Sequence, residues 1–359
     1  MKIRAAVLHG AGKPLEIESL DLTEPGEGEL LVKIAACGIC HTDEMQRRYP
    51  DYTPIVLGHE ASGVVTEVGP GVTEFSVGDH VALSYGSCGK CAACLENRPF
   101  ECENHGSYFD GWRRDGSTPL SLKGEPVAAF FCQGGFAEYA VVETRSATKV
   151  DGDIDLALVS PLGCGIQTGA GTIFNCFRPR PGQSIAIIGM GTVGLSAVMA
   201  AKLAGCKPII AVDRFDDRLY AAGELGATHC INGGKCADLL AAIRSVSSGL
   251  DFALDTSANS MLRALALKAL GRNGMGASLG YGSLPRLDAE DRALGKSWNG
   301  GIVEGSSVPQ TFIPYLLGLY KQGEFPIDRL ITVFPFEKIN EAFEANCRGA
   351  VIKSVAVMP

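Results

Sequence analysis

The sequence lacks the features of a membrane-spanning or exported protein. No stretch approaches the ~18 uninterrupted apolar residues that a transmembrane helix requires. Residues 1–5 show no apolar core or cleavage site of a secretory signal. Internal repeats and low-complexity tracts are also missing. We therefore expect a protein of the cytoplasm that has no membrane partner.

Basic residues are outnumbered, since 32 Lys and Arg face 40 Asp and Glu and the formal net charge is −8. This balance argues against a phosphate backbone as partner, so we expect no nucleic-acid binding. The composition of 46% hydrophobic and 20% charged residues is typical of a globular protein and excludes a disordered one. A length of 359 residues allows roughly two domains of ~100–200 residues each.

The pattern of apolar residues differs between two parts of the chain. Residues 1–150 carry short alternating runs separated by turn formers, which predicts a mainly β lobe. Further on, continuous apolar strands at 184–188 and 208–212 alternate with helices at 195–203 and 218–225. This alternation indicates a parallel sheet covered on both faces. Past about residue 305 the pattern becomes less regular.

Thirteen cysteines are many for a chain with no export signal. In a reducing compartment, clustered cysteines indicate metal binding and scattered ones indicate small core residues. Four thiols fall within fifteen residues, at Cys88, Cys91, Cys94 and Cys102. This spacing lets one loop wrap four thiolates around a tetrahedral zinc ion, with no open position, so the site would be structural. The alternative, four core or reactive cysteines, fits poorly with the Gly, Lys, Glu and Asn residues among them.

A second set of candidate ligands is dispersed along the chain, at Cys40, His59 and Cys164. Two thiolates and one imidazole with an open fourth position are the ligand set of a catalytic zinc in an alcohol dehydrogenase. The sequence alone does not assemble these three residues, because each type is more often structural. Cys37 and Cys40 could equally form a redox pair, although no thioredoxin-like context surrounds them.

A glycine-rich hexapeptide follows a predicted buried strand and opens a predicted helix, with glycines at Gly189, Gly191 and Gly194. In this context the motif predicts a dinucleotide site, with the pyrophosphate at the helix N-terminus. Asp213 closes the next strand, where a carboxylate binds the ribose diol and repels a 2′-phosphate, so NAD is favoured over NADP. The adjacent Arg214 favours the opposite preference, since an arginine there can accommodate the 2′-phosphate of NADP.

Along its whole length the chain resembles the zinc-dependent medium-chain alcohol dehydrogenases. The resemblance rests on the motifs at residues 40–43 and 58–60, the four-cysteine segment and the glycine-rich loop. Within that family, further stretches resemble the benzyl-alcohol (aryl-alcohol) dehydrogenase branch, at residues 161–171, 301–305, 312–314 and 319–323.

The resemblance implies an α/β protein with two domains. A GroES-like, mainly β catalytic domain would cover residues 1–165 and carry a structural zinc lobe at about 86–104. A Rossmann coenzyme domain with a doubly wound parallel sheet would cover 166–304. Residues 305–359 would return to the catalytic domain.

The resemblance also implies roles for individual residues. Cys40, His59 and Cys164 would hold the catalytic zinc, with water or Glu60 able to visit the remaining position. Asp43 would hydrogen-bond the His59 ring and fix its tautomer.

Other positions match residues that handle the proton and the cofactor. Thr42 would take the substrate proton, but Met45 stands where liver-type relatives carry a proton-relaying histidine. The remaining matches are to cofactor ligands. His41 and Lys353 would hold the pyrophosphate, Arg218 would lie near the adenosine ribose, and Thr168 would lie beside the nicotinamide.

The expected activity is hydride transfer between NAD and a primary aromatic alcohol and its aldehyde, with two zinc ions per subunit. Alternative substrates are allylic terpenoid alcohols such as geraniol, and S-hydroxymethylglutathione. Alternatives from other classes are a nucleic-acid binder built on the zinc ribbon and a non-catalytic relative. The segment from about residue 105 to 131 resembles the longer lobe of dimeric relatives, so we expect a homo-oligomer, with a dimer favoured over a tetramer.

Overall fold

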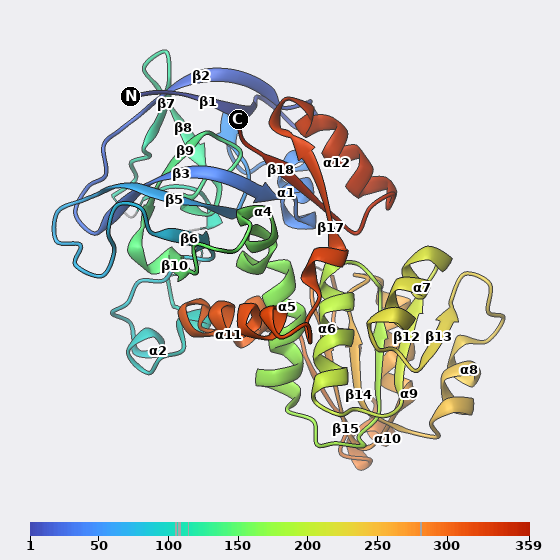
Figure 1. The fold of residues 1–359 in the computed structure, drawn as a ribbon. Coiled ribbons are helices and arrows are strands. Elements are labelled where there is room, and N and C mark those ends of the chain that lie inside the picture. The colour runs from blue at the N-terminus through green and yellow to red at the C-terminus, as the bar shows by residue number, and fades with distance from the viewer. Residues whose placement is uncertain (105, 107–108, 114, 281) are drawn as a thin grey trace. The chain divides into compact units, whose positions relative to one another are not determined.

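The structure is a computed structural model that describes residues 1–104, 106, 109–113, 115–280 and 282–359. The chain forms two compact units (Figure 1). The first unit comprises Met1–Gly165, Val308–Leu319 and Ile327–Pro359, and the second comprises Ile166–Ser307 and Tyr320–Pro326. Four residues of the segment on which the expected dimer rests (105, 107, 108 and 114) lie outside the described ranges.

Short strands build the first unit, as the alternating runs predict. A closed barrel contains five of them, in the order β1 (Lys2–Leu8), β2 (Glu16–Leu22), β7 (Leu120–Leu122), β8 (Glu125–Ala129) and β4 (Ile55–Val56). A second sheet runs β10 (Ala147–Val150), β6 (His80–Leu83), β5 (Glu60–Val68), β3 (Glu29–Gly38), β18 (Lys353–Val357) and β17 (Ile331–Pro335), with β9 (Tyr139–Glu143) also paired to β3. The late strand β18 is antiparallel to β3, with Ala356 opposite Cys37.

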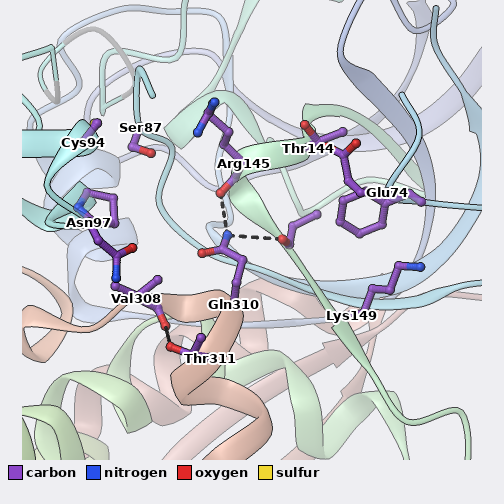
Figure 2. Close-up of a pocket in the computed structure, with 13 residues that line it drawn as sticks. Glu74, Ser87, Cys94, Asn97, Thr144, Arg145, Lys149, Val308, Gln310 and Thr311 are labelled. Atoms are coloured by element: carbon purple, nitrogen blue, oxygen red, sulfur yellow. Dashed lines mark hydrogen bonds between the residues drawn. The ribbon is translucent and has the colours of Figure 1, made fainter. Parts of the chain in front are cut away.

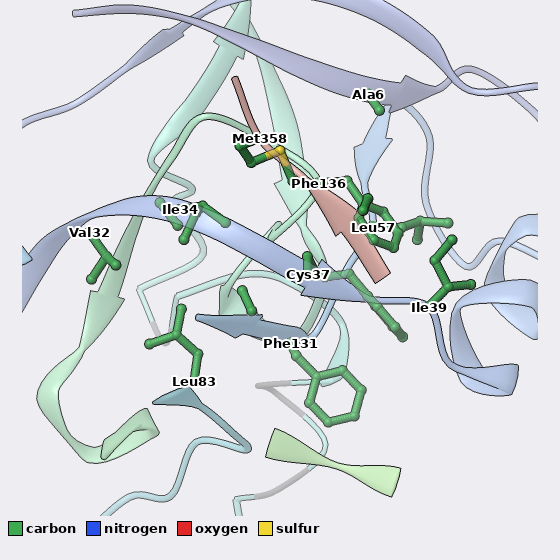
Figure 3. Close-up of a cluster of buried hydrophobic side chains, with 14 of the residues drawn as sticks. Ala6, Val32, Ile34, Cys37, Ile39, Leu57, Leu83, Phe131, Phe136 and Met358 are labelled. Atoms are coloured by element: carbon green, nitrogen blue, oxygen red, sulfur yellow. The ribbon is translucent and has the colours of Figure 1, made fainter. Parts of the chain in front are cut away.

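Side chains from both the barrel and the second sheet form one hydrophobic core (Figure 3). Ile34 and Cys37 of β3, Leu57, and Phe136 contribute buried side chains to it. Met358, just after β18, joins the same cluster. Within the described ranges, the helices of this unit include α1 (His41–Arg48), α2 (Ala92–Leu95), α4 (Leu156–Val159), α12 (Ile339–Arg348) and the first part of α11 (Pro309–Lys321). Burial of β18 side chains in this core explains why a distant segment completes the first unit.

The second unit is built on a six-stranded parallel sheet. Its order is β13 (His229–Asn232), β12 (Ile209–Asp213), β11 (Ile185–Ile188), β14 (Leu250–Asp255), β15 (Leu270–Ser278) and β16 (Ser297–Asn299). The principal helices are α5 (Gly165–Gly171), α6 (Thr192–Leu203), α7 (Asp216–Leu225), α8 (Leu239–Val246), α9 (Ser260–Ala269) and α10 (Ala289–Ala293). In chain order the strands run 3-2-1-4-5-6, which is the doubly wound Rossmann arrangement. The predicted parallel sheet is confirmed.

Within the described ranges, no single helix is both long and apolar enough to cross a membrane. Leu156–Gly163 and Gly165–Phe177 reach that length only when they are taken together across a break.

Candidate functional site

The start of α1 positions four of the predicted site residues. Cys40 caps the helix, and its backbone N–H donates to Asp43 Oδ2 at 2.9 Å. Thr42, in the first turn, places its Oγ1 3.6 Å from Cys40 Sγ. His41 begins the helix with an exposed side chain, and its contact with a cofactor stays a prediction.

Asp43 also orients His59 from across the fold. Its Oδ1 lies 3.0 Å from His59 Nδ1 and accepts the backbone N–H of Gly58 at 3.0 Å. Because an ionised carboxylate only accepts hydrogen bonds, Nδ1 carries a proton and Nε2 points the other way. His59 Nε2 is buried and has no hydrogen-bond partner among the described residues. A buried nitrogen in this state is suited to a metal ion.

Four ligand atoms converge around that nitrogen. One atom from each of Cys40, His59, Glu60 and Cys164 lies within 4.8 Å of all the others, and the two sulfurs are 3.9 Å apart. The Cys164 hydrogen bond and the nearby His59 lower the pKa of Cys40 well below its ordinary value, against the effect of burial. Burial alone would lower the pKa of His59, but the charges of Asp43 and Cys40 raise it well above its ordinary value. Negative charge is therefore concentrated where a cation would bind.

Glu60 belongs to this cluster but is already engaged. Its Oε2 lies 2.5 Å from Lys353 Nζ, and both side chains are almost fully buried. Lys353 also donates to the Ile39 carbonyl at 3.0 Å. Burial raises the pKa of Glu60 to about 7, although the Lys353 ammonium acts in the opposite direction. The role of Lys353 toward a pyrophosphate stays a prediction.

Aromatic rings surround the His59 side of the cluster. Phe131 stacks on the His59 ring with centroids 4.6 Å apart, and Phe130 meets it edge to face at 5.5 Å. Phe109 contacts both phenylalanines at 5.1 and 5.2 Å, and it is only partly buried. These rings give the candidate site an apolar, aromatic wall. Sequence reasoning missed them, although the adjacent Phe130 and Phe131 were a visible signal.

The four-cysteine segment folds as a separate cluster. The sulfurs of Cys88, Cys91, Cys94 and Cys102 all lie within 4.8 Å of one another. Backbone N–H groups, that of Lys90 first, lower the pKa of Cys88 to about 5, which favours a thiolate. All thirteen cysteines of the chain are free thiols, so no disulfide competes for these sulfurs. Four convergent thiols fit one zinc ion held in a closed shell.

A cavity of about 610 Å³ lies beside the four-cysteine segment and not at the His59 cluster. Figure 2 shows Gln310 crossing it, with the amide donating to the backbone oxygens of Arg145 at 2.8 Å and Ala147 at 3.3 Å. Among the described residues that line it, Cys94 is the only predicted site residue. Volume alone therefore does not identify the chemical centre of this unit.

In the second unit, the three glycines of the loop occupy three different environments. At Gly189, φ is +95°, and a Cβ would meet Thr256 Oγ1 at 2.5 Å. At Gly194, a Cβ would lie 1.8 Å from the Gly189 carbonyl oxygen, so helix and strand pack too closely for any side chain. Gly191 caps α6 and faces open space. This cradle at a helix N-terminus fits a pyrophosphate.

Asp213 stands at the end of β12 and supports the loop directly. Its Oδ2 accepts the backbone N–H of Met190 at 2.6 Å, and its Oδ1 accepts that of Arg214 at 2.7 Å. The guanidinium groups of Arg214 and Arg218 lie 4.8 and 5.3 Å from the Phe215 ring centroid. Acceptor and cations thus meet at the edge where the sequence predicts the adenosine ribose.

Thr168, predicted to lie beside the nicotinamide, is on α5. Its hydroxyl donates to Glu304 Oε2 at 2.6 Å. Residues 301–305 resemble the aryl-alcohol dehydrogenase branch, but the sequence does not predict this contact.

Comparison with known proteins places the chain in a family. Residues 26–152 match the alcohol dehydrogenase GroES-like domain, and residues 192–313 match the zinc-binding dehydrogenase domain. A geraniol dehydrogenase from Castellaniella defragrans is 41% identical over 99% of this chain and 97% of its own. The chain belongs to the zinc-dependent medium-chain alcohol dehydrogenase family. This confirms both the resemblance and the predicted pairing of a GroES-like unit with a Rossmann unit.

Two solved structures are similar to this alcohol dehydrogenase over its full length. A zinc-binding alcohol dehydrogenase domain protein from Burkholderia ambifaria has a TM-score of 0.96 and 43% identity, with 100% of this chain and 99% of that chain covered. A benzyl alcohol dehydrogenase from Acinetobacter calcoaceticus has a TM-score of 0.95 and 41% identity, with 100% of both chains covered. The relatives thus include enzymes named for an aromatic and for a terpenoid alcohol.

Proposed function

We propose that this alcohol dehydrogenase uses NAD to oxidise primary alcohols in which the carbinol is attached to an aromatic ring. The observation that carries the proposal is the convergence of Cys40, Cys164 and the partnerless His59 Nε2 in one buried cluster. In this proposal these three residues hold a catalytic zinc, and the four-cysteine segment holds a second, structural one. Asp213 favours NAD over NADP because its carboxylate repels a 2′-phosphate.

In this proposal, different residues of the chain have different roles in alcohol oxidation. The bound groups supply Lewis-acid chemistry, which lowers the pKa of an alcohol hydroxyl, and a hydride acceptor. Asp43 holds His59 in the tautomer that presents Nε2, and Thr42 accepts the alcohol proton through its hydroxyl. Met45 cannot pass that proton on, because a thioether has no exchangeable hydrogen. With no relay at position 45, the proton taken up by Thr42 would have to leave by another route.

The aromatic wall supports the choice of substrate. Phe130, Phe131 and the partly exposed Phe109 form a continuous set of ring contacts that reaches His59. A contact between a substrate ring and one of these side chains would contribute on the order of 0.5–1.5 kcal/mol beyond the burial of apolar area. Geraniol is the second candidate, because a geraniol dehydrogenase is as similar to this chain, at 41% identity, as the benzyl alcohol dehydrogenase.

Steady-state kinetics with NAD test the proposal on benzyl alcohol, geraniol, S-hydroxymethylglutathione and cyclohexylmethanol. Cyclohexylmethanol is the matched control, since it has six ring carbons but no aromatic face. We expect kcat/KM to be higher for benzyl alcohol than for cyclohexylmethanol by roughly 2- to 10-fold, and Phe109→Leu should reduce this ratio. A higher kcat/KM for geraniol would reject aromatic alcohols as the substrate class but would still support alcohol dehydrogenase activity. No turnover of any of these alcohols would reject both the substrate class and the activity.

A further inference from the structure

A strained turn carries a buried carboxylate in the Rossmann unit. Glu304, Gly305 and Ser306 have φ values of 44°, 66° and 50°, so three consecutive residues adopt the left-handed conformation and two of them are not glycine. Non-glycine residues rarely adopt this conformation, and each such residue costs on the order of 1 kcal/mol or more. Glycine would suit position 304 better, so the backbone does not explain a glutamate there.

Tight packing fixes this turn against α5. A Cβ on Gly305 would lie 2.6 Å from the Gln167 carbonyl oxygen and 2.7 Å from Gly171 Cα. Asn175 donates to the Gly305 carbonyl at 3.1 Å. The direction of the Glu304 side chain is therefore set by the fold.

A short hydrogen bond holds the Glu304 carboxyl group in place. The residue is only 9% exposed, and the hydroxyl of Thr168 donates to it at 2.6 Å. A carboxyl group is thus held inside the unit, next to a residue of α5.

The topology places this carboxyl group in the second half of the predicted dinucleotide site. In a doubly wound sheet the dinucleotide lies across the carboxyl ends of the strands, one mononucleotide on each half. Asp213 marks the adenosine half at the end of β12, so the nicotinamide half belongs to β14, β15 and β16. Glu304 follows the carboxyl end of β16 by five residues. α5 also packs against the start of α6, since a Cβ on Gly169 would lie 2.0 Å from the Val193 carbonyl oxygen.

We propose that Glu304 is a specificity residue for the redox state of the cofactor, and this rests on the proposed use of NAD. The nicotinamide ring is positively charged in NAD⁺ and neutral in NADH. A fixed carboxylate on that side of the crevice attracts the oxidised ring and gains nothing from the reduced one. Glu304 therefore lowers the Kd for NAD⁺ relative to NADH and so favours alcohol oxidation over aldehyde reduction in cofactor binding.

The test measures the Kd of NAD⁺ and of NADH by fluorescence titration of the zinc-loaded protein. Glu304→Gln keeps the shape of the side chain and removes the charge. Its ratio of Kd(NAD⁺) to Kd(NADH) should rise on the order of tenfold. Glu290→Gln removes an exposed carboxylate on α10 and should leave the ratio unchanged. Glu304→Gly, which suits the left-handed backbone, should fold readily and show the same rise.

The possible outcomes distinguish the role of Glu304 from the proposed use of NAD. A rise in the ratio for both Glu304 variants, with Glu290→Gln unchanged, supports the inference. Equal changes in the two Kd values would show a purely structural role and overturn it while NAD use stands. A wild-type protein that binds neither nucleotide would overturn the proposed function, and the inference with it.

Discussion

Replacing Arg263 by methionine should strongly destabilise the Rossmann unit. Arg263 on α9 and Asp255 at the end of β14 have fully buried side chains, and Arg263 Nε donates to Asp255 Oδ2 at 2.7 Å. The guanidinium also donates to the carbonyl oxygens of Ser283 at 3.2 Å and Gly280 at 3.3 Å. The pair therefore joins the carboxyl ends of two neighbouring strands, β14 and β15.

The expected loss of unfolding free energy depends on which charged groups stay buried after each substitution. Arg263→Met removes the three hydrogen bonds named above and leaves the Asp255 carboxylate buried without its cation, which should lower the free energy of unfolding by about 3–5 kcal/mol. The double variant Asp255→Asn/Arg263→Met holds no buried charge at this position. Its loss should be smaller than the sum of the two single losses, with a coupling of roughly 1–3 kcal/mol.

The two tryptophans make this measurable for one unit. Trp298 lies in β16 and donates to Ser278 Oγ at 2.9 Å, whereas Trp112 lies in the first unit. In a Trp112→Phe background, urea unfolding followed by fluorescence reports on the Rossmann unit alone. Arg244→Met, at an exposed position on α8, is the control and should change stability by less than about 0.5 kcal/mol. A loss below about 1 kcal/mol for Arg263→Met, or strictly additive single losses, would refute the reasoning.

Three further changes test other parts of the molecule. Cys94→Ser should reduce bound zinc from two ions per chain to one and lower the Tm, while the exposed Cys347→Ser keeps both values; a wild type with one zinc contradicts this. Asp213→Gly should raise the KM for NAD and lower that for NADP, and a wild-type preference for NADP in kcat/KM would disprove the assignment. Although burial opposes it, bonds to the ammonium groups of Lys268 and Lys296 lower the pKa of Asp291 to about 2. The unfolding free energy should thus fall by roughly 1–2 kcal/mol as pH drops from 4 to 2, and Asp291→Asn should flatten this slope in urea titrations at each pH.

The Rossmann unit was largely predictable because its signals are local. The apolar run at 184–188 and the glycines after it correspond to β11 and the start of α6. β15 was harder, since it begins at Leu270 and continues through the polar Arg272 and Asn273, beside a break in its register with β14. Only its apolar end at 276–279 resembled a buried strand. The pairing with β14 passes from Leu270 to Met275 and skips the polar part, where Asn273 donates its backbone N–H to the Leu294 carbonyl at 2.8 Å. No local pattern records that contact.

The candidate catalytic cluster was predictable only through resemblance. Cys40 and Cys164 are 124 residues apart, and their sulfurs come within 3.9 Å only once the fold is complete. Periodicity and spacing cannot report such a contact, because each residue sits in a stretch with its own local structure. The same limit applies to Glu304 and Thr168, which are 136 residues apart and share one hydrogen bond. Their roles toward a bound cofactor stay predictions until measured.

The pairing of β18 with β3 has a consequence for biosynthesis. Every candidate ligand of the His59 cluster has been synthesised by residue 164, but Lys353, which forms an ion pair with Glu60 within it, is made roughly 190 residues later. At ~5–20 residues per second, the nascent first unit waits on the order of ten to forty seconds for its last central strand. The Rossmann unit, encoded in between, can fold during that interval. The thiols of Cys40 and Cys164 therefore spend that time beside an incomplete sheet, so newly made chains should be more easily oxidised than finished ones.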